Sequence, residues 1–478
     1  MADIALVLRG GTVVDEAGSR LADVAIDVDG MVVAVEPGID GAGRMSGSTA
    51  RVLDCGGCIV GPGLVDLHTH LREPGREEAE TIETGSRAAA LGGYTAVVAM
   101  PNTEPAIDSA AVVREVLEHG AKALCAVYPA AAITVGRAGE QLVPMAELAA
   151  LGVRIFTDDG DGVQDSRLMR RALEYASALD VTLAQHCEDK GLSHGGHMHE
   201  GEWSSRLGIP GIPAEAEELM VARDIVLGRL TGAPVHFLHL STAGSVELVR
   251  QAKAKGLRVT AEAAPHHFTL THAEVASYDP VFKVNPPIRG DDDVAAVKAG
   301  LVDGTIDAIA TDHAPHAQEL KEAPFDEAPC GMLGLETALS LAISELGLPI
   351  ERVLALMSWQ PARIARIEAP GVVPGAPASL CVIDPTATWV VDPSRLASRS
   401  SRSGRGRRPG WCAPPSAGRP TPSAPCSRPP PRSRPPDRRA PPGASTSRRG
   451  RWSSSRRWTT SPPHPAPGPA YGRRAPSP

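Results

Sequence analysis

The chain has 478 residues and a net charge of −8, and its charges are divided unevenly between two parts. Residues 399–478 contain 18 arginines, no lysine and one acidic residue, which leaves 30 basic and 55 acidic residues, a net charge of −25, in residues 1–398. An acidic body of this kind argues against a nucleic-acid-binding surface, and no apolar run reaches the ~20 residues of a membrane-spanning helix.

The first 60 residues favour a small β-domain. Short alternating apolar runs lie at residues 4–8, 24–28 and 31–35, and Asp29-Gly30 separates the last two. Asp-Gly between two such runs is a hairpin signal. We therefore expect the N-terminal part of a small β-domain over residues 1–60.

From residue 64 onward, apolar strand candidates alternate with helical stretches. The eight strand candidates are residues 64–68, 95–100, 123–128, 153–157, 181–185, 235–240, 258–262 and 306–311. One of the helical stretches, residues 166–179, carries an apolar stripe with a period of 3.6 residues. Eight such units predict an α/β fold of the (β/α)8 TIM-barrel class over residues 61–367.

Metal-binding types of side chain stand at five of the eight predicted strand ends, where barrel enzymes build their active sites. In chain order these side chains are His68 and His70, Asp158-Asp159, His186, His239 and Asp312. The first two lie at i and i+2 of a strand and so face the same side, with Arg72 repeating the spacing. This pattern is the main functional signal in the sequence.

Four imidazoles and two carboxylates are enough for a binuclear metal centre with a bridging carboxylate. A single-zinc site that uses three or four of these ligands stays open as the alternative.

The chain beyond the barrel divides into two parts. Residues 368–398 resume β-like patterning at Val372-Val373, 380–383 and 389–391, which predicts a return to the N-terminal β-domain. After Leu396 no Ile, Leu, Val, Met or Phe occurs. Because such a segment cannot bury enough apolar surface to offset its ordering entropy, residues 399–478 are predicted to be a disordered tail. Arg, Pro, Ser, Ala and Gly are what GC-rich codons give out of frame, so we interpret the tail as a frameshift product.

Eight motifs, in this order, make the chain resemble a known enzyme family. They are H-T-H-L-R-E-P-G, M-P-N-T, F-T-D-D-G, H-C-E-D, H-L-S-T, A-P-H-H, N-P-P-I-R and T-D-H-A-P-H. Their combination resembles the dihydroorotase family of the amidohydrolase superfamily, in the branch whose bridging ligand is an aspartate. The resemblance covers residues 4–396.

The resemblance implies site residues by motif. Two zinc ions would be bound, one by His68 and His70 and the other by His186 and His239. Asp159 would bridge them, with Asp158 as the less suitable choice, and Asp312 would ligate the first ion and act as general acid and base. The implied substrate-binding residues are His70, Arg72, Asn102, Asn285, His316, Cys330 and Gly331.

The same resemblance implies the reaction, a reversible hydrolysis of dihydroorotate to N-carbamoyl-aspartate in pyrimidine biosynthesis. It implies Zn²⁺ as cofactor, one or two ions per chain, and a small-molecule substrate, with no nucleic-acid or membrane partner. Association with a second copy or with aspartate transcarbamoylase is compatible with it. The eight scattered cysteines and the lack of a signal peptide favour a reduced, cytoplasmic chain.

Two features depart from the family pattern, and two alternative functions remain. Cys330 stands where the family usually has Phe, and the tail replaces its closing strands. A related cyclic amidase, such as an allantoinase or hydantoinase, typically has a lysine at the end of strand 4, where this chain has Asp158-Asp159. A metal-free homologue that only scaffolds aspartate transcarbamoylase is disfavoured because every ligand position is intact.

Overall fold

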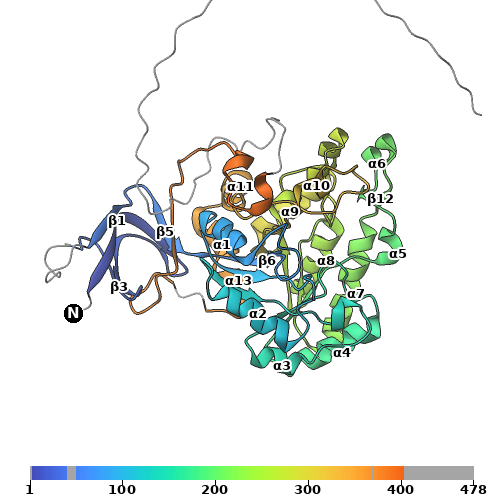
Figure 1. Ribbon diagram of the computed structural model, residues 1–478, viewed down its shortest axis with the longest axis horizontal. Coiled ribbons are helices and arrows are strands. Elements are labelled where there is room, and N and C mark those ends of the chain that lie inside the picture. The colour runs from blue at the N-terminus through green and yellow to red at the C-terminus, as the bar shows by residue number, and fades with distance from the viewer. Residues whose placement is uncertain (1–2, 40–49, 369–370, 403–478) are drawn as a thin grey trace, which may run out of the picture. The chain divides into compact units, whose positions relative to one another are not determined.

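The computed structural model describes residues 3–39, 50–368 and 371–402 (Figure 1). The disordered tail predicted for residues 399–478 lies outside the described residues apart from its first turn, η6 (Arg399–Arg402).

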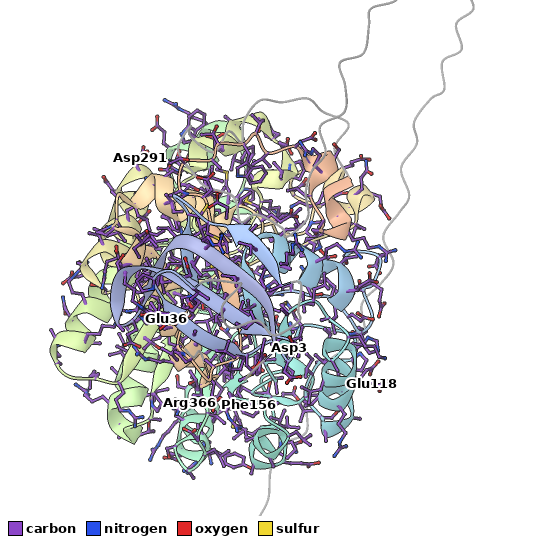
Figure 2. The ribbon with its side chains drawn as sticks, turned by 90° about the vertical axis from the view of Figure 1, so that its left-hand side faces the viewer. Asp3, Glu36, Glu118, Phe156, Asp291 and Arg366 are labelled. Carbon is purple, nitrogen blue, oxygen red and sulfur yellow. The ribbon has the colours of Figure 1, made fainter. Side chains whose placement is uncertain are left out.

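The small β-domain is built from both ends of the described chain. Its strands are β1 (Ile4–Asp15), β2 (Gly18–Asp27), β3 (Val32–Glu36), β4 (Arg51–Asp54), β5 (Ile59–Pro62) and β16 (Leu380–Ile383). The order is β16-β5-β1-β2-β3, with β4 also paired to β1, and β16 runs antiparallel to β5 with Val382 opposite Val60. Figure 2 shows this sheet in front of the barrel, with Asp3 and Glu36 labelled on it. The composite β-domain of the sequence-based fold prediction is therefore present.

Two of the three β-like patches expected after the barrel are not strands. Val372 is fully buried in a loop, where its amide donates to Asp15 and its carbonyl accepts from Arg20. Trp389 donates its indole N–H to the Ser340 hydroxyl of a barrel helix, over 3.3 Å. In both segments, contacts with side chains take the place of a strand ladder, and periodicity alone does not reveal them.

Each of the eight predicted barrel strands is present. They are β6 (Leu64–Thr69), β7 (Tyr94–Ala99), β8 (Ala126–Pro129), β9 (Ile155–Phe156), β10 (Thr182–Gln185), β13 (Val235–Phe237), β14 (Val259–Ala263) and β15 (Ala308–Ile309). Parallel ladders join β6, β7 and β8 into one sheet and β9, β10, β13, β14 and β15, in that order, into another. Parallel bridges from Ala131 to Phe156 and from Thr69 to His313 connect these two sheets at both sides. The strands therefore close into a barrel.

The helices of the barrel follow its strands in the expected alternation. They are α1 (Ile82–Leu91), α2 (Ala110–Gly120), α3 (Met145–Ala150), α4 (Ser166–Ala176), α7 (Glu215–Thr231), α8 (Ala243–Ala254), α9 (Asp291–Asp303), α11 (Ala338–Leu346), α12 (Ile350–Met357) and α13 (Trp359–Ala365). Shorter elements in the loops are α5 (Lys190–Ser193), β11 (Met198–His199), α6 (Glu202–Leu207), β12 (Gly211–Ile212) and α10 (Gln318–Lys321). No helix among the described residues is long and apolar enough to cross a membrane.

Strand residues alternate between two apolar clusters. Val97, Phe156 and Leu183 pack in the large cluster with helix residues, whereas their neighbours Val98 and Ile155 pack in a second, smaller cluster. The alternation follows from the two-residue period of a strand, which points successive side chains to opposite faces. The two clusters hold the strands rigidly, so the residues at the strand ends are fixed in position.

Candidate metal centre

The predicted metal-type residues converge at the carboxyl ends of the barrel strands. His68 belongs to β6 and His70 follows it, Asp159 follows β9, and His186 follows β10 directly. His239 and Asp312 follow β13 and β15, both with a positive φ, 29° and 47°. Strained backbone of this kind is tolerated where tertiary contacts fix it, and it is frequent at functional sites.

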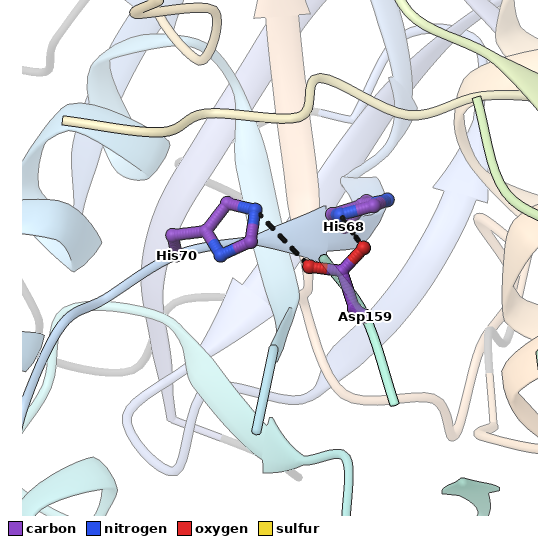
Figure 3. Close-up of side chains that lie close together, drawn as sticks. All are labelled: His68, His70 and Asp159. Atoms are coloured by element: carbon purple, nitrogen blue, oxygen red, sulfur yellow. Dashed lines mark ion pairs between the residues drawn. The ribbon is translucent and has the colours of Figure 1, made fainter. Parts of the chain in front are cut away.

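Asp159 stands between two pairs of histidines. Its Oδ1 lies 3.3 Å from Nε2 of His68, and its Oδ2 lies 3.6 Å from Nε2 of His70 (Figure 3). Oδ1 also lies 3.5 Å from Nδ1 of His186. His239 Nε2 lies 3.8 Å from Oδ1. These residues form two groups able to hold a metal ion, His68–His70–Asp159 and Asp159–His186–His239, with all ligand atoms of a group within 4.8 Å of one another.

One donor atom of the first group lacks a hydrogen-bond partner, as expected of a metal ligand. Nε2 of His68 is buried and makes no hydrogen bond within the described residues, although Asp159 lies beside it. Unpaired buried polar atoms are rare because each costs ~1–3 kcal/mol. A nitrogen and oxygen donor set with buried, unsatisfied lone pairs is what zinc-like ions require.

Three of the histidines are oriented by a hydrogen bond on the nitrogen that faces away from the centre. His68 Nδ1 lies 2.9 Å from Oε1 of Glu262, and His186 Nε2 lies 3.2 Å from Oε2 of Glu188. His70 Nδ1 lies 2.9 Å from the side-chain oxygen of Asn102. An ionised carboxylate or an amide oxygen only accepts, so in each pair the histidine donates, and in the neutral imidazole that binds metal the lone pair is then on the other nitrogen, which faces the centre.

The charges of the centre favour a bound cation. Burial alone would raise the pKa of the Asp159 carboxyl, but the surrounding imidazoles, His68 first, hold it well below its usual range. Burial would also lower the pKa of His186, yet hydrogen bonds to Asp159 and Glu188 raise it to about 9. A pocket that stabilises protonated imidazoles in this way also stabilises a metal cation at the same place.

Asp312 projects to the edge of the first histidine pair. Its Oδ1 lies 3.1 Å from His70 Nε2 and 3.6 Å from His68 Nε2. Although burial favours the neutral acid, the hydrogen bond from His70 and the charge of His68 lower the pKa of Asp312, which keeps it ionised. An ionised carboxylate at this position can accept a proton from a water in the centre.

Arg72 and His316 form the next layer outward. Arg72 is 5% exposed, has a φ of 62° and donates Nε–H to the carbonyl of Pro315. One of its terminal nitrogens lies 3.3 Å from Nε2 of His316. Within the described residues, no carboxylate lies in salt-bridge contact with the Arg72 guanidinium, so it is available to an anion.

The remaining predicted substrate residues also border the centre. Asn102 donates to Asp159 over 3.4 Å, and Asn285 donates to Glu188 over 2.9 Å. The carbonyl of Cys330 accepts from His316 over 2.7 Å. A side chain at Gly331, which has a φ of 149°, would meet the His316 ring at 2.8 Å, so only glycine leaves this ring in place.

Asp158, the less suitable candidate for the bridge, points away from both groups. Its Oδ1 accepts the amides of Ile133 and Thr134 at 2.8 and 3.0 Å, and its Oδ2 accepts the Thr134 hydroxyl. It therefore fixes the loop after β8 and is not available to a metal ion.

Two residues of the centre are absent from the sequence-based prediction, namely Glu188 and Glu262. Glu188 lies in the H-C-E-D motif, and Glu262 is the one charged residue of the buried strand β14. An acidic residue in a buried strand is costly unless it is paired, and that signal could have identified Glu262.

Comparison with known proteins agrees with this geometry. A family model described as dihydro-orotase-like matches residues 57–245. The chain is 52% identical to the dihydroorotase of Pelotomaculum thermopropionicum over 401 residues, covering 82% of this chain and 92% of the relative. The chain belongs to the dihydroorotase family. The dihydroorotase of Mycobacterium leprae is 49% identical over 395 residues, covering 81% of this chain and 92% of the relative. The family resemblance found in the motifs is thus confirmed.

This member of the dihydroorotase family shares its fold with solved hydantoinase and dihydropyrimidinase structures. L-hydantoinase from Arthrobacter aurescens matches with a TM-score of 0.74 at 22% identity, covering 87% of this chain and 94% of that chain. Dihydropyrimidinase from Brevibacillus agri matches with a TM-score of 0.70 at 22% identity, covering 82% of this chain and 89% of that chain. At this identity the likeness concerns the fold, and it confirms the predicted barrel class.

Proposed function

We propose that this chain is a zinc-dependent dihydroorotase that interconverts dihydroorotate and N-carbamoyl-aspartate in pyrimidine biosynthesis. The observation that carries the proposal is the position of Asp159, which is shared by the pairs His68–His70 and His186–His239, beside an ionised Asp312. Curated relatives of 45–52% identity that are named dihydroorotase support the same reaction.

The metal roles in this proposal follow the two groups. One zinc ion would be held by His68, His70 and Asp312, the other by His186 and His239, with Asp159 between them. Bound there, zinc supplies Lewis acidity toward the substrate carbonyl and lowers the pKa of water to near neutrality. Imidazole donors suit zinc, as they also suit copper, iron and nickel.

Asp312 is the proposed general acid and base. In hydrolysis it accepts the proton of the attacking water and delivers it to the ring nitrogen as the amide C–N bond breaks. In the reverse direction the carbamoyl nitrogen bonds to the side-chain carboxyl carbon, and Asp312 takes the proton of that nitrogen and delivers it to the carboxyl oxygen that leaves as water. Its position 3.6 Å from His68 and 3.1 Å from His70 supports this role, because a water held at the centre would lie beside it.

Arg72, Asn102, Asn285 and His316 are the proposed substrate contacts, together with His70, Cys330 and Gly331. The substrate carboxylate matches the fork of the Arg72 guanidinium, which can bind both of its oxygens. The two asparagine amides can then hydrogen-bond the N–H and C=O edges of the ring.

We place this activity in the cytoplasm, because the six cysteines within the described residues are all free thiols, as expected in a reducing compartment.

We also propose that residues 399–478 are a frameshift product rather than a functional domain. The curated relatives match over 81–85% of the chain, which supports an end to the family sequence near this point. Sequencing the gene around the codons for residues 392–402 tests this directly. If no single-base insertion or deletion there restores an apolar, strand-patterned C-terminus, the tail needs another explanation.

The experiment that tests the function is a direct assay of both directions with the metal-loaded full chain. Dihydroorotate should be hydrolysed and N-carbamoyl-aspartate cyclised, and hydantoin or allantoin should be turned over far more slowly. Preference for hydantoin or allantoin would favour the related cyclic amidases instead.

A further inference from the structure

We propose that Glu262 and Glu188 are positioning residues, each of which orients one histidine of one metal group and thereby tunes the two ions separately. The inference rests on the proposed function, since it assigns roles to residues behind the ligands of that centre. Neither glutamate belongs to the groups that could hold a metal ion themselves.

Glu262 stands at the middle of a buried chain of hydrogen bonds. Its Oε1 accepts from His68 Nδ1 over 2.9 Å, and its Oε2 accepts from His236 Nε2 over 3.0 Å. His236 Nδ1 in turn lies 2.9 Å from the hydroxyl of Thr260. His68, His236 and Glu262 are each 0% exposed, so water does not compete for these bonds.

This arrangement fixes the protonation of His68. An ionised carboxylate has no proton to donate, so both Glu262 oxygens are acceptors in these two hydrogen bonds. His68 must then carry its proton on Nδ1, and Nε2, which faces Asp159, is left as the lone pair. The negative charge behind the ring also makes that lone pair more basic.

Glu188 orients His186, a histidine of the other pair, through a hydrogen bond of its own. Its Oε2 lies 3.2 Å from His186 Nε2, 2.9 Å from the Asn285 amide nitrogen and 3.1 Å from the Lys190 ammonium. His186 therefore donates from Nε2, and its Nδ1 faces Asp159 and His239. The link to Asn285 also connects this ion to a proposed substrate contact.

A glutamine at position 262 would disturb the hydrogen bond of one of two histidines, and a glutamine at position 188 would remove the negative charge beside His186. The amide has one accepting oxygen and one donating nitrogen, whereas Glu262 accepts from two histidines. If the amide nitrogen faces His68, the imidazole proton must move to Nε2, where it occupies the lone pair meant for the metal. The substitution changes neither size nor shape, so a loss of metal affinity reports protonation rather than packing.

The test measures zinc affinity in two backgrounds that each keep one metal group. In His186→Ala the pair His68–His70 remains intact, and in His70→Ala the pair His186–His239 does. Glu262→Gln and Glu188→Gln are added singly to each background, and zinc is titrated against a chromophoric chelator. Glu217→Gln is the matched control, because Glu217 is equally buried but binds Ser241 and Thr242 rather than a histidine of the centre.

We expect a reciprocal pattern. Glu262→Gln should lower zinc affinity by ~10–100-fold in the His186→Ala background, and Glu188→Gln should do so in the His70→Ala background. Each should leave the affinity within about threefold in the other background, as should Glu217→Gln in both.

The inference is overturned if both glutamine variants bind zinc like their backgrounds, or if they lower affinity equally in both. If Glu262→Gln does not fold, as judged by circular dichroism, the more exposed Glu188 decides the question alone. A wild-type chain that binds no zinc would overturn the proposed function itself, whereas a wild-type chain that binds two ions with unaffected variants would overturn only this inference.

Discussion

The two histidine pairs of the metal centre reach Asp159 by different routes. His68 and His70 come from one strand end, two residues apart, whereas His186 and His239 come from β10 and β13, 53 residues apart in sequence. The first pair is a local consequence of strand geometry, and the second exists only because the barrel brings two strands side by side. Asp159 joins a locally specified half-site to one specified by the fold.

The largest expected effect comes from Asp159, the residue that the two halves share. Asp159→Asn should weaken both metal groups together and lower kcat/KM by ~10⁴-fold, the scale seen when one member of a cooperating catalytic set is removed. Metal content and turnover measure this. Asp158→Asn is the matched control, because the Asp158 carboxylate is adjacent in sequence but accepts from the amides of Ile133 and Thr134 instead. Loss of only one ion in Asp159→Asn would show that the halves are independent.

Asp312 sharpens the comparison because it touches only the first pair. Asp312→Asn keeps the shape of the side chain but removes the proton acceptor, so kcat should fall by at least ~10²-fold. Zinc on the His68–His70 side should weaken, and zinc on the other side should stay bound. Near-normal turnover in this variant would mean that the proton takes another route.

Arg72 tests whether the substrate is anchored outside both pairs. Arg72→Met should raise KM by roughly 10- to 150-fold, which corresponds to the ~1.5–3 kcal/mol of a charge-assisted contact. Metal content should be unchanged, since Arg72 lies beyond the ligands. An unchanged KM would make Arg72 a support for the Pro315 carbonyl rather than a substrate residue.

The smallest effect is expected at the end of the described chain. A chain that stops after residue 402 should keep its zinc content and its kcat/KM within about twofold, because the frameshift proposal gives the removed residues no functional role. A chain that stops after residue 396 loses the Ser398 hydroxyl and the Arg399 amide, both of which donate to the buried carboxylate of Glu80. It should lose ~1–3 kcal/mol of unfolding free energy. Equal thermal stability of the two shortened chains would contradict this role of Glu80.

Much of the barrel is predictable from the sequence because the same pattern recurs at each of its strands. All eight barrel strands could be placed, since each is a short apolar run followed by polar residues at its carboxyl end. His68 and His70 were recognisable from their spacing alone. The position of His239 beside His186 depends on a parallel pairing between distant strands, which spacing does not encode.

Some contacts could not be predicted from the sequence. Glu262 is recognisable as an acid in a buried strand, but no local signal marks its pairing with His68, 194 residues away. Val372-Val373 was expected to form a strand because its composition suits one, yet Asp15 and Arg20 bind its backbone instead. In both cases the deciding contact is tertiary.

The most direct test of the central claim is the zinc content of the purified chain measured alongside its dihydroorotate hydrolysis during stepwise removal and return of metal. We predict two ions per chain, complete loss of activity on chelation and recovery as zinc is restored. Full activity in the metal-free chain, or two tightly bound ions without any turnover of dihydroorotate, would contradict it.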